Sequence, residues 1–219
     1  MLKKDFQNLY GTIKTLPSFL LRLVKKNYLL TASIIIAYCL LFFFDPLVRD
    51  LFSKLHNNTN DFIVSIGHFY GKPYLIFFSI ILFYLLGIII KKENIRKIGL
   101  KFFESFLISG IIVTVIKSIL GRWRPYTGNG SYSFVPFTLG PNDHLSLPSG
   151  DVATAFAFSV IAASLINNKL WKVFWFLLAT ISAIGRIYND QHWLTDVLLA
   201  AVISITVGYH IIQQNQERE

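Results

Sequence analysis

A polar stretch between two apolar runs, Gly185 to Asp196, contains the residue types of a nucleophilic site. His192 and Asp196 are four residues apart, so on a helix they share one face and the carboxylate can hold one imidazole nitrogen. The other nitrogen is then free to attack an electrophile. Arg186 precedes His192 by six residues and can bring a fixed positive charge to the same pocket. The stretch therefore predicts a nucleophile, a group that orients it and a clamp for an anion.

Two segments nearer the N-terminus add further anion-binding groups. Lys117 and Arg124 are seven residues apart, which predicts that they share one face of a helix. Ser149 and Gly150 stand at the predicted start of another helix, where unpaired N–H groups and the helix dipole favour an anion. With Arg186, these basic residues would neutralise the charge on a phosphoryl group in transfer. The sequence has no carboxylate cluster suited to magnesium, so we expect neither a metal ion nor another cofactor.

Together the three segments form a recognisable pattern: K-x6-R-P from Lys117, P-S-G-D from Pro148, and R-x5-H-x3-D from Arg186. This order and spacing resemble the three-part signature of the type-2 phosphatidic acid phosphatase superfamily, membrane lipid phosphatases related to vanadium-dependent haloperoxidases. The similarity covers about residues 100–210 and is strongest with bacterial lipid phosphatases, including the lipid A 1-phosphatase type. It implies that His192 forms a phosphohistidine, that Asp196 fixes its tautomer, and that water then releases phosphate.

Two positions depart from the family pattern. Gly185 stands where members usually have a serine, which removes one hydroxyl donor. Asp151 stands where members usually have the histidine that protonates the leaving oxygen. A charged Asp151 would repel phosphate, so it can act as the acid only if burial and the anion raise its pKa. Otherwise the residue is a natural variant suited to a leaving group that needs less help, such as phosphate in a diphosphate, or a replacement that disables the enzyme. His144, just upstream, is an alternative proton donor.

Several functions remain open at this stage. The first is a phosphatase for a lipid such as lipid A 1-phosphate, with undecaprenyl diphosphate and phosphatidylglycerol phosphate as alternative substrates. A phosphotransferase that passes the group to another lipid uses the same residues, and so does an anion or lipid transporter that is not an enzyme. We expect a lipid phosphate and membrane lipids as partners, with neither nucleic acid nor an obligate protein partner.

Composition places these residues in an all-α integral membrane protein. Of 219 residues, 53% are apolar and 15% charged, and the mean hydropathy is +0.52, which is too apolar for an ordinary soluble domain. The net charge of +9 fits the basic loops of a membrane protein, because no nucleic-acid-binding motif accompanies it. The single cysteine, Cys39, lies in an apolar run and excludes an intrachain disulfide.

The hydropathy pattern predicts a six-span bundle over residues 27–213, preceded by an amphipathic interfacial helix over residues 1–26 and followed by a polar tail over residues 214–219. Residues from Asp45 to Lys72 are expected to be a loop, with a short helix from Asp61 to Tyr70 and with His56 and His68 as ordinary loop residues. Pro125 is expected to end the third span, and His210 to lie in the core. The predicted spans are Tyr28 to Phe44, Tyr74 to Ile90, Phe102 to Leu120, a fourth from Pro148, Val173 to Ile187, and Trp193 to Ile212.

Basic residues orient the bundle. Six spans put both termini on one side, and that side then holds 14 of the 21 Lys and Arg residues. The seven outside are Arg49, Lys54, Lys72, Lys117, Arg122, Arg124 and Arg186. We therefore expect a bacterial inner-membrane protein with cytoplasmic termini and a site that faces the periplasm.

Overall fold

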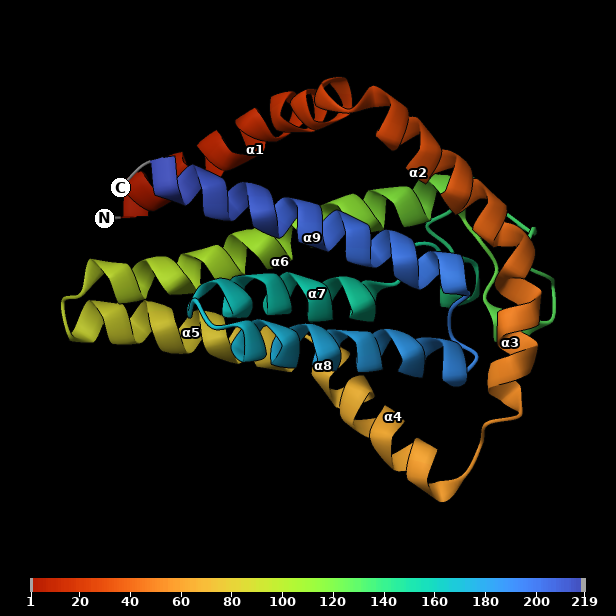
Figure 1. The fold of residues 1–219 in the computed structure, drawn as a ribbon. Helices are drawn as coiled ribbons and strands as arrows, with labels where there is room; N and C mark the ends of the chain where they lie inside the picture. Colours follow the sequence, from red (N-terminus) through yellow and green to blue (C-terminus); the bar gives the residue numbers. More distant parts are fainter. Residues whose placement is uncertain (1, 218–219) are drawn as a thin grey trace.

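The computed structural model describes residues 2–217, which are helical apart from loops and one isolated bridge between Arg122 and Phe134. The helices are α1 (Leu2–Lys26), α2 (Tyr28–Leu41), α3 (Asp45–Ser53), α4 (Asn58–Gly71), α5 (Tyr74–Ile89), α6 (Glu93–Leu120), α7 (Gly150–Ser164), α8 (Lys169–Tyr188) and α9 (Leu194–Glu217), with 3-10 turns η1 (Phe42–Phe44), η2 (Pro125–Thr127) and η3 (Asn142–His144). In Figure 1, α5 to α9 lie alongside one another as a bundle, and α3 and α4 lie towards the end where α8 passes into α9.

Helix α7 forms the centre of the core. Every residue from Val152 to Ala163 is buried except Thr154, and α7 contacts α6, α8 and α9. Its small Ala and Ser side chains let these neighbours approach closely. Ser149 caps the start of α7. The N-terminus of this central helix lies at the end of the bundle where the predicted site residues gather.

The helices support a multi-pass membrane protein. Within residues 2–217, four segments are long and apolar enough to cross a bilayer: Tyr28–Ser53, Glu93–Leu120, Lys169–Tyr188 and Leu194–Glu217. Helices α4 and α5 make a fifth crossing if the pair, bent by 45°, counts as one span. Helix α7 has 15 residues, fewer than the ~20 that usually span the hydrocarbon core. The count of six spans stays a prediction.

The loop predicted from Asp45 to Lys72 is wrong, since most of it is helical. Pro46 lies in the first turn of α3, where its missing N–H leaves no helical bond unmade. Asn57 caps α4 by accepting a hydrogen bond from the Asn60 N–H at 2.9 Å. Asn57 therefore starts a helix in a segment that was expected to be a loop. Helix α4 also extends beyond the short helix expected from Asp61 to Tyr70.

The end of α6 also differs from the prediction. The helix stops at Leu120 with Gly121 in the left-handed region (φ 60°), before Pro125 is reached. Arg124 lies beyond the helix in extended backbone. Lys117 and Arg124 therefore do not share a helix face, although both reach the same cavity, as described below.

Helix α1 turns a polar face inwards. Asp5 pairs with Arg96, and the Thr12 hydroxyl donates to Glu104 at 3.1 Å. Among the apolar side chains of α1, Leu16 and Phe19 are buried in the core, whereas Phe6, Ile13, Leu20 and Leu23 stay exposed. The placement of α1 at a membrane interface stays a prediction.

The first turn of α1 lies near the last turn of α9 at one end of the bundle (Figure 1). Helix α9 continues through Glu217, so the polar tail predicted from residue 214 is helical in its described part. Residue 1 of the predicted N-terminal helix and residues 218–219 of the predicted tail lie outside the described residues.

Candidate active site

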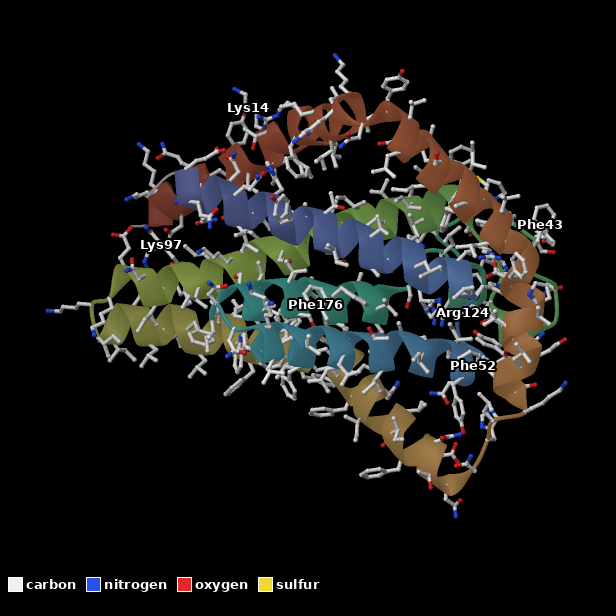
Figure 2. All side chains as sticks on the ribbon, viewed as in Figure 1. Lys14, Phe43, Phe52, Lys97, Arg124 and Phe176 are labelled. Carbon is white, nitrogen blue, oxygen red and sulfur yellow. The ribbon has the colours of Figure 1, made fainter. Side chains whose placement is uncertain are left out.

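A cavity of about 570 Å³ opens where α4, α6 and α8 reach their C-terminal ends and α7 begins. The 3-10 turn η3 also contributes to its lining. Its lining residues are His68, Lys72, Lys117, Arg124, Asn142, Gly150, Asp151, Arg186, Asn189, Gln191 and His192. In Figure 2, Arg124 lies near the end of the bundle where α3, α8 and α9 meet, whereas Lys97 lies at the opposite end. Six of the eight predicted site residues line this cavity; Ser149 and Asp196 lie behind it.

His192 is buried in the turn before α9, with only 2% of its surface exposed. Its Nδ1 lies 3.6 Å from Asp196 Oδ2 and 3.5 Å from the Ser146 hydroxyl. The first distance is longer than an ordinary hydrogen bond. Burial lowers the pKa of His192 to about 3, and nearby Lys117 contributes in the same direction against the opposing effect of Asp196. The imidazole is therefore uncharged at neutral pH and can act as a nucleophile.

Asp196 is held from several sides. Its Oδ2 accepts hydrogen bonds from the Ser146 hydroxyl at 2.5 Å and the Trp193 N–H at 2.9 Å. Its Oδ1 accepts from Arg122 at 2.6 Å, and the same guanidinium donates to Asp45 at 2.6 Å. Arg122, Asp45 and Asp196 are each 0% exposed, and they form a closed ion-pair cluster behind His192. Sequence reasoning gave Arg122 and Asp45 no role, because no spacing rule connects residues 77 positions apart.

Two of the three predicted phosphate-binding cations, Lys117 and Arg124, are fixed by uncharged partners. Lys117 Nζ donates to the carbonyl of Leu145 at 2.5 Å. Arg124 donates to the carbonyl of Asn142 at 2.9 Å and to the side chain of Gln191 at 3.0 Å. Carbonyl oxygens orient these groups without cancelling their charge. The arrangement is suited to an anion in the cavity.

The start of α7 supplies the predicted helix N-terminus. Ser149 accepts a long hydrogen bond from the Val152 N–H at 3.5 Å, and its own N–H donates to the carbonyl of Asp196 at 3.1 Å. Ser149 is fully buried, so it connects α7 to α9 and does not face the cavity. Gly150 lines the cavity, and a Cβ at this position would meet no atom within 4 Å. The backbone at Gly150 is therefore open to a ligand.

Asp151 is paired with two cations. Its Oδ2 lies 3.1 Å from Lys72 Nζ and 3.1 Å from an Arg186 guanidinium nitrogen. Cations at this distance favour a charged carboxylate, so the geometry does not favour Asp151 as a neutral acid. The Nε of Arg186 is buried and has no hydrogen-bond partner among the described residues.

Two residues of α4 and its cap were missed as site residues. His68 was expected to be an ordinary loop residue, yet its Nδ1 lies 3.3 Å from Arg186. Lys72 was only counted among the basic residues outside. The signal that could have found them is the repeated Gly-basic pair in G-H-F-Y-G-K, residues 67–72.

The remaining histidines lie away from the cavity. His144, the alternative proton donor, packs its ring against Trp123 with centroids 3.9 Å apart and is not among the lining residues. His210 is buried against α1, where its Nε2 lies 3.1 Å from the Thr15 hydroxyl, in agreement with the predicted core position.

Comparisons with known proteins give one family. The sequence model of the PAP2 superfamily matches residues 98–219. Lipid A 1-phosphatase of Porphyromonas gingivalis is 35% identical over 81 residues, which are 36% of this chain but only 18% of that relative's length.

Two solved structures share the fold, each with a TM-score of 0.58. Aquifex aeolicus LpxE is 22% identical, over 77% of this chain and 94% of that one. A transmembrane PAP2-type phosphatidylglycerolphosphate phosphatase from Bacillus subtilis is 17% identical, over 96% of this chain and 98% of that one. At these identities the likeness concerns the fold.

Proposed function

The chain belongs to the PAP2 superfamily, and we propose that it removes a phosphate group from a membrane lipid, such as lipid A 1-phosphate, through a phosphohistidine on His192. The observation that carries this proposal is a buried, uncharged imidazole on a cavity that also holds four Lys and Arg side chains. A nucleophile beside concentrated positive charge suits attack on a phosphate. The name of the Porphyromonas gingivalis relative supports lipid A among the candidate substrates.

The proposed reaction has two steps. Lys117, Arg124 and Arg186 bind the phosphoryl oxygens, and the amide at Gly150 points a helix N-terminus at the same charge. His192 Nε2 attacks phosphorus while the bond to the lipid oxygen breaks. Water then attacks the phosphohistidine, the P–N bond breaks, and inorganic phosphate leaves.

Asp196 orients His192 and stabilises the positive charge that forms on its ring. As His192 bonds to phosphorus its ring becomes positively charged, and the 3.6 Å contact with Asp196 can shorten to a charge-assisted hydrogen bond. Arg122 and Ser146 hold the carboxylate in place for this role. The cationic side chains supply the charge that a metal ion provides elsewhere, so we expect full activity with a chelator present.

We also propose that the cavity faces the periplasm of a bacterial inner membrane. In Figure 2, Lys14 and Lys97, both predicted to be cytoplasmic, lie towards the end of the bundle away from Arg124. In a Cys39→Ser background, a membrane-impermeant maleimide added to intact cells should label Asn129→Cys and not Glu93→Cys. The reverse pattern would place the cavity in the cytoplasm.

The test of function is phosphate release by the purified protein in detergent with chelator. The substrates are lipid A, undecaprenyl diphosphate and phosphatidylglycerol phosphate, and His192→Ala is the inactive comparison. We expect free phosphate from at least one lipid and a loss of several orders of magnitude in the variant. A phosphorylated lipid acceptor in place of free phosphate would indicate a transferase. Phosphate flux that survives His192→Ala, without hydrolysis, would indicate a transporter.

A further inference from the structure

Glycines bring one face of α4 against the cavity. A Cβ on Gly67 would lie 2.6 Å from the carbonyl oxygen of Ile181 in α8, and a Cβ on Gly185 would lie 3.1 Å from Val64 in α4. A larger residue at position 67 would clash with the backbone of α8, and one at position 185 would press on the Val64 side chain. The serine that the family usually carries at position 185 would therefore crowd this contact. The close approach delivers His68 and Lys72, each following a glycine of α4, to the cavity.

Lys72 lies directly beside the position where the family pattern has a proton donor. Its Nζ donates to Asp151 at 3.1 Å, and Asp151 replaces the family's histidine. An ammonium group has three N–H donors, and Asp151 is the one side-chain acceptor that Lys72 has among the described residues. The side chain of Lys72 is 31% exposed and lines the cavity, so its other protons can reach a ligand.

His68 is the other candidate donor, and its geometry argues against that role. The Arg186 guanidinium can only donate, so the contact at 3.3 Å makes His68 Nδ1 an acceptor and leaves a single proton on Nε2. Loss of that proton would leave an anionic imidazolate, which is much less stable than the neutral amine that lysine leaves when it donates a proton. His68 therefore orients Arg186.

We propose, on the basis of the function proposed above, that Lys72 is the proton donor to the leaving oxygen and that Asp151 is the residue that positions it. As His192 Nε2 bonds to phosphorus and the lipid P–O bond breaks, the oxygen takes a proton from the Lys72 ammonium, which becomes a neutral amine. In the second step that amine takes a proton from the attacking water while the P–N bond breaks. The ammonium is restored, and phosphate leaves.

This arrangement also accounts for a carboxylate inside a phosphate site. Asp151 alone would repel the substrate, but Lys72 and Arg186 balance its charge and leave net positive charge around it. Lipid monoesters, whose alkoxide needs a proton to leave, then become competent substrates. The preference for diphosphates expected from an unassisted Asp151 does not follow.

The test compares two leaving groups in Lys72→Gln: hexadecyl phosphate, which needs a proton donor, and 4-nitrophenyl phosphate, which does not. General acid catalysis contributes ~10²–10⁴ in rate, so we expect a loss of that size on the alkyl ester and less than about tenfold on the aryl ester. Lys54→Gln, at an exposed lysine outside the cavity, is the control and should match wild type on both. Equal losses on the two esters would make Lys72 a binding or structural residue and overturn the inference.

Repeating Lys72→Gln in an Asp151→His variant separates the loss of a proton donor from a loss of folding. Asp151→His installs the family's own acid, so adding Lys72→Gln to it should cost less than about tenfold on hexadecyl phosphate. An undiminished loss in that background would contradict the inference, and so would full activity of the single Lys72→Gln variant. Wild-type protein that releases phosphate from neither ester nor any lipid phosphate would instead overturn the phosphatase function itself.

Discussion

Arg122 and Arg124 are two residues apart, and their surroundings differ in one decisive respect. Arg122 is 0% exposed and donates to two carboxylates, Asp45 and Asp196, at 2.6 Å each. Arg124 is 6% exposed and donates to uncharged oxygens of Asn142 and Gln191. The charge of Arg122 is therefore balanced inside the protein, whereas that of Arg124 is available to a ligand. Buried positive charge marks an anion site only where the protein leaves it uncompensated.

The same distinction separates the two larger regions. The cluster of Arg122, Asp45 and Asp196 is closed and supports the fold behind the nucleophile. The cavity lining has the cations Lys72, Lys117, Arg124 and Arg186 against the single carboxylate Asp151. The excess of positive charge there suits a dianionic phosphate.

The largest expected effect on stability is that of Arg122→Met. Removal of the guanidinium leaves Asp45 and Asp196 as buried charges without their partner, and breaking such a pair costs ~3–5 kcal/mol. Arg124→Met is the matched control, because it removes a buried charge that forms no ion pair with a carboxylate within residues 2–217. Unfolding of both variants in the same detergent measures the difference. Equal destabilisation would contradict the contrast between the two arginines.

The rate of phosphate release should fall strongly in Arg124→Met when the folded fraction is matched to that of wild type. Loss of one positioned donor to a transition-state oxygen typically costs ~10²–10³ in rate. The measurement is kcat/KM for phosphate release from the preferred lipid. A variant with half the wild-type value would remove Arg124 from the phosphate site.

A smaller effect concerns pH and the buried nucleophile. The pKa of His192 is about 3 in the folded protein, against an ordinary 6.5. Between these values the unfolded chain binds an extra proton, so stability falls as the pH drops below about 6.5, by up to ~1.4 kcal/mol per pH unit. His192→Gln removes this dependence. Unfolding of the two proteins at pH 7 and pH 5 should diverge, and parallel decline would mean that His192 is not held neutral by burial.

Much of the site could be predicted from sequence, because its residues fall in three local motifs. His192, Arg186, Lys117, Arg124, Gly150 and Asp151 all line the cavity. The helices follow from apolar runs in the same way. Helix ends were harder, since Gly121 ends α6 before Pro125 and Asn57 starts α4 where a loop was expected.

The remainder depends on contacts between distant segments. Lys72 meets Asp151 because the end of α4 packs closely on both α7 and α8, and that packing depends on backbone approaches that hydropathy does not encode. Asp45 meets Arg122 across 77 positions for a similar reason. Periodicity can place a residue on a face of its own helix, but the partner of that face is set by the whole bundle.

The most direct test of the central claim is to trap the phosphoryl group on His192. Protein mixed with ³²P-labelled lipid phosphate is quenched in alkali within the first turnover, and the label is located by peptide mapping. The account predicts alkali-stable label on the peptide that contains His192, lost in His192→Ala and retained, with slower formation, in Arg124→Met. Phosphate release without labelled protein, or label at another residue that persists in His192→Ala, would contradict it.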